Sequence, residues 1–105
     1  MVLTPADAVA SIVVHRHDDT FVEQLKAANA SFADPTFEAE LATYLRHHPQ
    51  LVDAWEVWAE DQRWTPTAYF HGTETGWYDG AQRRHVRHHP DRAVAAADFI
   101  HRLAG

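Results

Sequence analysis

The chain contains no cysteine, only four glycines and a single lysine, Lys26. Without cysteine it can form no disulfide, no thiolate zinc site and no cysteine nucleophile. Long apolar runs are also missing: the stretch over residues 8–14 is interrupted by Ser11, whereas a membrane span needs about 18 or more apolar residues. No basic leader precedes that stretch, as it would in a secretory signal. We therefore expect a cytoplasmic protein without a membrane anchor.

What is present fits one folded unit. The 105 residues are 46% hydrophobic and 23% charged, and they include four Trp, five Phe and three Tyr, which is enough for a core. We expect a single globular domain over residues 1–105. Fifteen acidic residues against nine Lys and Arg give a net charge of −6, which disfavours binding to nucleic-acid phosphates or anionic lipid.

Helix-start signals recur through the first sixty residues. A capping side chain precedes proline at Thr4-Pro5 and Asp34-Pro35, and proline also follows His47-His48. We predict four helices, over residues 5–16, from 19 or 20 to about 32, from 34 to 47, and from 49 onward. Their expected inward stripes are Val9, Ile12 and Val13; Phe21, Leu25, Ala28 and Phe32; Phe37, Leu41, Tyr44 and Leu45; and Leu51, Trp55 and Trp58.

The pattern changes after Pro66. Residues 67–71 and 76–79 are rich in strand-forming side chains, and the segment between them reads as a turn, without the lysine and helix of a phosphate-binding loop. Residues 84–87 could add a third strand. A closing helix is expected after His89-Pro90-Asp91, with Asp98 and Arg102 as an i, i+4 pair. The predicted class is α+β, mostly helical: four helices, a two- or three-stranded antiparallel sheet near residues 67–87, and a C-terminal helix.

Histidine is abundant, with nine residues. His15 and His17 lie two apart, and His47-His48 and His88-His89 are adjacent pairs. Neither spacing places two imidazoles on one helix face, so a metal site would need ligands brought together by the fold. A histidine-based divalent-metal protein is one alternative, and solvated loop histidines are the simpler interpretation. We assign no metal ligand and no cofactor.

Catalytic patterns are sparse. Ser11 and Ser31 are the only serines, and neither lies in a Gly-x-Ser-x-Gly turn. A small enzyme could use His71, Glu74 and Asp79 around the hairpin as an acid–base set, provided that a pocket brings them together. No residue is assigned as catalytic, and the enzyme hypothesis stays a second alternative.

The one basic run covers residues 83–89 and has three arginines without interleaved aromatic rings. A nucleic acid would favour such rings for stacking. An acidic protein partner, or pairing with Glu56 and Glu60 within the chain, suits the run better.

Four aromatic residues around the predicted strands, Trp64, Tyr69, Trp77 and Tyr78, are candidates for contact with a protein partner. The chain is similar only in general type to many small bacterial proteins, such as toxin-neutralising immunity proteins and other stoichiometric inhibitors. That similarity carries no residue over. We expect a non-enzymatic protein-binding or regulatory module.

Overall fold

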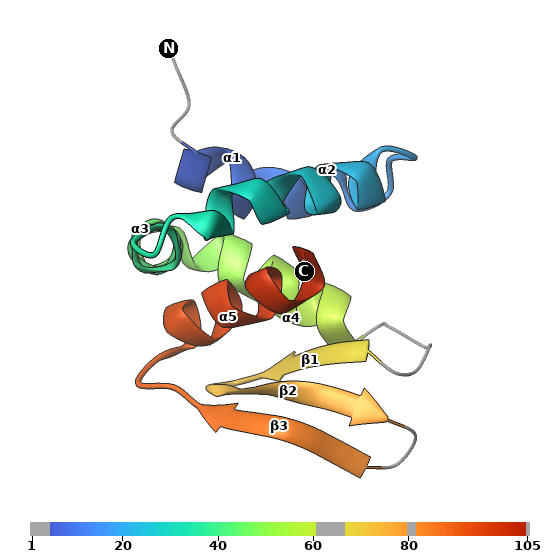
Figure 1. Ribbon diagram of the computed structural model, residues 1–105, viewed down its shortest axis with the longest axis vertical. Coiled ribbons are helices and arrows are strands. Elements are labelled where there is room, and N and C mark those ends of the chain that lie inside the picture. Colours follow the sequence, from blue (N-terminus) through green and yellow to red (C-terminus); the bar gives the residue numbers. More distant parts are fainter. Residues whose placement is uncertain (1–4, 61–66, 80–81, 105) are drawn as a thin grey trace.

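The computed structural model describes residues 5–60, 67–79 and 82–104. Helices precede and follow one sheet (Figure 1). The helices are α1 (Pro5–Ala10), α2 (Phe21–Ala28), α3 (Phe37–Arg46), α4 (Pro49–Glu60) and α5 (Arg92–Ala104); two 3₁₀ segments are η1 (Ser11–His15) and η2 (Asn29–Ala33); the strands are β1 (Thr67–His71), β2 (Glu74–Asp79) and β3 (Gln82–His88). The predicted α+β class is confirmed.

The first two predicted helices are each divided. The α-helical part of the first ends at Ala10, and residues 11–15 continue as the 3₁₀ segment η1. Three consecutive β-branched residues, Ile12, Val13 and Val14, have low helix propensity because their χ1 rotamers crowd the preceding turn. The second predicted helix likewise becomes α2 followed by η2.

The third helix begins later than predicted. Asp34 accepts hydrogen bonds at Oδ1 from the backbone N–H and the hydroxyl of Thr36, both at 2.9 Å, so it stabilises a turn instead of capping the helix. These two bonds lower the pKa of Asp34. The helix α3 starts only at Phe37.

The core lies between the helices and one face of the sheet. Trp55 of α4 is fully buried, and its indole N–H donates to the carbonyl of Ala10 at 3.0 Å, which ties α4 to α1. Its ring lies 6.3 Å from both Phe21 of α2 and Phe99 of α5, measured between centroids. The predicted inward positions of α2, α3 and α4 therefore meet in one cluster, to which α5 adds Phe99 and Ile100.

The three strands form an antiparallel sheet in the order β1-β2-β3. Of the two sheets left open by the sequence, the three-stranded one is present, and its third strand is longer than the expected residues 84–87. A two-residue turn, Gly72-Thr73, joins β1 to β2. Gly72 has φ of 60°, a left-handed conformation that this kind of hairpin turn requires and that glycine adopts without steric cost. Its backbone N–H donates to Glu56 Oε2 at 2.8 Å, which anchors the hairpin on α4.

A buried polar cluster joins the sheet to α5. The Thr75 hydroxyl donates to Asp98 Oδ2 at 2.5 Å, and His89 Nε2 lies 2.9 Å from the same hydroxyl oxygen. Arg102 Nε donates to Asp98 Oδ2 at 3.0 Å, so the predicted i, i+4 pair is formed. The cluster fixes how α5 lies on β2. At the start of α5, Asp91 caps the helix by accepting the N–H of Val94 at 3.0 Å.

Candidate functional site

Strand register divides the sheet into two faces. Phe70 pairs with Thr75, and both side chains lie on the face covered by α5, where Phe70 contacts Phe99 at 5.8 Å between ring centroids. Side chains alternate along a strand. The opposite face, here called the outer face, therefore carries the cross-strand pairs His71 with Glu74, Tyr69 with Gly76, Glu74 with His88, and Tyr78 with Arg83.

Tyr69 and Glu74 form the centre of the outer face. The Tyr69 hydroxyl donates to Glu74 Oε2 at 2.5 Å, and the tyrosine is only 5% exposed because its ring lies across Gly76. Burial, followed by the bond to the Glu74 carboxylate, raises the pKa of Tyr69 to about 12. The same bond, aided by the charge of Arg83, lowers the pKa of Glu74.

Arg83 covers this pair. Its Nη1 lies 3.3 Å from Glu74 Oε2, and its guanidinium carbon lies 5.8 Å and 5.9 Å from the ring centroids of Tyr69 and Tyr78. The two tyrosine rings are 4.5 Å apart at their centroids. Ion pairing and cation–π attraction act together here, so one arginine connects both rings with the carboxylate.

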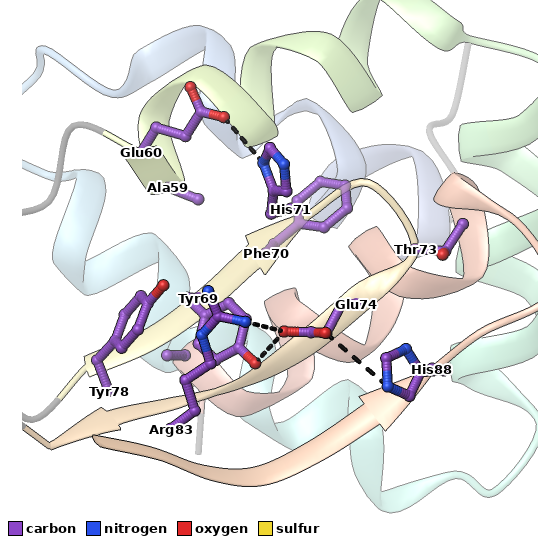
Figure 2. A pocket seen from close by; sticks show the side chains of 11 residues that line it. Ala59, Glu60, Tyr69, Phe70, His71, Thr73, Glu74, Tyr78, Arg83 and His88 are labelled. Carbon is purple, nitrogen blue, oxygen red and sulfur yellow. Dashed lines mark hydrogen bonds and ion pairs between the residues drawn. The ribbon is translucent and has the colours of Figure 1, made fainter. Parts of the chain in front are cut away.

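A pocket of about 580 Å³ opens beside these groups (Figure 2). Figure 2 shows Arg83 pointing toward Glu74, while His88 approaches the same carboxylate from β3, with Nε2 3.8 Å from Oε1. The end of α4 contributes Ala59 and Glu60 to the rim. The lining combines aromatic rings, an arginine and two carboxylates within a volume typical of ligand-binding pockets.

The four predicted contact residues do not all lie together. Tyr69 and Tyr78 both line the pocket on the outer face. Trp77 points to the opposite face, half-buried against the core, and lines a second pocket of about 400 Å³ between the sheet and α5. Trp64 lies outside the described residues.

The predicted acid–base set is distributed over three separate interactions. His71 Nδ1 lies 3.2 Å from Glu60 Oε1, and Asp79 Oδ2 lies 3.3 Å from Arg84 Nε. Glu74 is held by Tyr69 and Arg83, as described above. Each member of the set is thus bonded to a different partner.

Histidine pairs are likewise separated by the fold. His15 Nδ1 pairs with Asp18 at 3.0 Å, and the ring of His48 stacks on Tyr44 with centroids 4.0 Å apart. His89 belongs to the buried cluster with Thr75, whereas His88 points to the outer face. Within the described segments, no three His, Asp or Glu side chains are grouped so that they could hold a metal ion.

Several site residues were not predicted from the sequence. The expected pairing of the basic run over residues 83–89 with Glu56 and Glu60 is wrong, because its arginines pair with Glu74, Asp79 and Asp98. The signal that identifies Arg83 and His88 is the register of β3 against β2. No residue spacing within the sequence encodes that register directly.

Comparison with protein-family models, with curated proteins and with solved structures gave no match. In the parts of the chain that the structure describes, no helix has the length and apolar character needed to cross a membrane.

Proposed function

We propose that the protein is a non-enzymatic protein-binding module, of a regulatory or inhibitory kind, whose partner docks on the outer face of the sheet. The observation that carries the proposal is the grouping of Tyr69, Tyr78 and Arg83 around one pocket on the face opposite α5. Tyrosine and arginine are enriched at protein interfaces and among the residues that dominate binding energy. The lack of cysteine in the chain suits the cytoplasm as the place of this function.

The geometry of the pocket supports binding because its groups are already held in place. Tyr69 is fixed by its bond to Glu74 and by the close approach to Gly76, and Arg83 is held by the carboxylate and two rings. A partner that inserts a side chain here loses little free energy in ordering these groups, which favours affinity.

The same geometry gives less support to acid–base catalysis. A general base works best when its pKa lies near the working pH. The pKa of Glu74 is lowered, and its Oε2 already accepts the bond from Tyr69. His71 and Asp79 face other partners. We therefore prefer binding to the small-enzyme alternative.

Affinity capture from a lysate of the native host, followed by mass spectrometry, tests the proposal. The bait variants are Tyr78→Ala on the outer face and Val57→Ala as a control, because Val57 is an exposed residue on α4. We expect the wild type and Val57→Ala to capture the same protein, and Tyr78→Ala to lower its recovery about tenfold, as for an interface hot spot.

Equal recovery with Tyr78→Ala would show that the outer face is not the docking surface. Capture of no specific protein by the wild-type bait would count against protein binding altogether. Circular dichroism of each bait separates loss of the surface from loss of the fold.

A further inference from the structure

The charges of the protein are unevenly distributed. Eleven of the fifteen acidic residues precede residue 67, in the segment that holds α1 to α4. Residues 82–89, which include β3, contain three arginines and three histidines and no acidic residue. The strand β3 lies at the edge of the sheet, farther from the helices than β1 (Figure 1). A basic edge thus opposes an acidic helical layer.

All seven residues of β3 are exposed. The side chains of Arg83, Arg84 and Arg87 are 57%, 56% and 68% exposed, and their nearest carboxylate oxygens lie at 3.3, 3.3 and 3.8 Å. Exposed ion pairs contribute only about 0–1 kcal/mol each. A guanidinium also carries five N–H donors, more than one such pair uses. These arginines can therefore bind further carboxylates.

The cations lie on both sides of the edge. Arg83 and His88 belong to the outer face. Arg84 lies opposite Trp77 and Arg87 lies opposite Thr75 in the strand register, so both arginines belong to the face covered by α5.

On that second side, the pocket beside Trp77 is lined by His85, Arg87, His101, Arg102 and Asp98. Asp98 is already bonded to Arg102, Thr75 and His89, so its charge is offset within the buried cluster. The exposed Arg87 leaves this side positive as well.

We infer that β3 binds an acidic, extended segment of a protein partner, whose carboxylates meet the arginines on both sides of the edge. This inference rests on the proposed protein-binding function and names the chemistry of the partner. The acidic helical layer repels such a segment elsewhere, so the charge distribution also directs it to β3.

A second copy of the chain is a poorer occupant of this edge. Two copies joined along β3 would bring together two strands that each carry three arginines and no acidic residue, and like charges are unfavourable across paired strands. The strand also contains a bulge: Arg84–Arg87 spans three steps where Thr75–Trp77 spans two, and His85 has φ of 52°. Bulges and charged side chains both hinder continuous edge-to-edge pairing. Recognition through side chains fits β3 better.

The inference is tested by NMR titration of the ¹⁵N-labelled protein with a short peptide of repeated Glu-Glu-Ala, which places carboxylates on both faces of an extended chain. The Gln-for-Glu peptide is the charge control, and an oligothymidylate of the same length represents a nucleic acid. The protein variants are Arg84→Gln/Arg87→Gln and, with the same change of charge on the helical layer, Arg16→Gln/Lys26→Gln.

We expect the Glu peptide to shift the amides of residues 82–88, with binding that weakens as salt is raised. The Gln peptide and the Arg84→Gln/Arg87→Gln variant should each weaken binding about tenfold, and the control variant should leave it within about twofold. No shift at a peptide concentration of about 1 mM, equal binding of the Gln peptide, or tighter binding of the oligothymidylate would each overturn the inference.

The capture experiment separates this inference from the proposed function. A partner that depends on Tyr78 but is recovered equally by Arg84→Gln/Arg87→Gln bait would overturn the acidic-segment inference while the proposed function stands. Loss of the partner from both baits supports the two together.

Discussion

Gly76→Ala gives a direct test of how the outer face is built. A Cβ placed on Gly76 would lie 2.6 Å from Tyr69 Cε1 and 2.9 Å from its hydroxyl oxygen. Ordinary contacts of this kind begin at 3.4 Å, so the ring must move by about 0.8 Å. The ring cannot move without disturbing the 2.5 Å bond to Glu74.

Two opposing effects decide the stability of this variant. Overpacking typically costs about 1–3 kcal/mol. Replacing a mid-strand glycine by alanine returns about 0.5–1 kcal/mol, because alanine loses less conformational freedom on folding. The clash is the larger effect, and we expect Gly76→Ala to lower the free energy of unfolding by about 1–2 kcal/mol.

A double-mutant cycle with Tyr69→Val isolates the clash. Valine lacks the ring atoms that the new Cβ meets, so in this background Gly76→Ala should become neutral or stabilising by up to about 1 kcal/mol. The measurement is urea unfolding followed by tryptophan fluorescence. The same destabilisation in both backgrounds would refute the proposed contact between Gly76 and Tyr69.

The ionisation of Tyr69 provides a second readout. Its folded pKa of about 12 lies above the unfolded value of about 10, so the stability it confers is complete below pH 10 and is lost between about pH 10 and 12. Gly76→Ala should lower the Tyr69 pKa, seen as earlier phenolate absorbance. Gly72→Ala is the control: its Cβ meets nothing within 4 Å, so it should lower stability through its φ of 60° alone and leave the phenol titration unchanged.

Three further predictions concern the interior and the last helix. Thr75→Val removes a buried donor to Asp98 and should lower the free energy of unfolding by about 1.5–3 kcal/mol. Thr75→Ser keeps the hydroxyl and should lower it less. Equal urea midpoints for the two variants would contradict this. Trp55→Phe leaves the buried carbonyl of Ala10 without its indole donor and should cost about 2–4 kcal/mol in the same assay. Asp91→Ala removes the cap of α5 and should cost about 1 kcal/mol, with Asp91→Asn costing less. The helix-capping bond lowers the pKa of Asp91, so the stability that the Asp91 carboxylate confers is present above pH ~4 and is lost as the pH falls through the folded pKa. Acid unfolding of the wild type and of both Asp91 variants can show this loss.

Helix positions could be predicted because each helix has an apolar stripe that one core buries. Leu41, Leu45, Trp55 and Ile100 are all fully buried, as helical spacing indicates. The positions at which the first two predicted helices change to 3₁₀ form were not predicted. The run Ile12–Val14 follows the apolar spacing of a helix, but its β-branched side chains favour a strand. The apolar spacing alone does not show whether it outweighs this low helix propensity.

The third strand was harder to predict, because β3 buries no side chain. A strand signal from the sequence depends on alternation between a buried and a solvent-exposed face. Val86 is the single aliphatic residue among Gln82–His88, and it is itself exposed. The strand forms through backbone pairing with β2, and the side chains are left available for other contacts.

Alternation along β2 also explains why the predicted aromatic residues separate. Trp77 and Tyr78 are neighbours in sequence, so in a strand they must point to opposite faces. Trp77 faces α5, and Tyr78 faces the outer pocket. A partner that contacts only one face can reach only one of them. If both contribute to binding, the partner must pass around an edge of the sheet. The basic strand β3 is an edge that adjoins both residues, because its Arg84 and Arg83 pair with Trp77 and Tyr78.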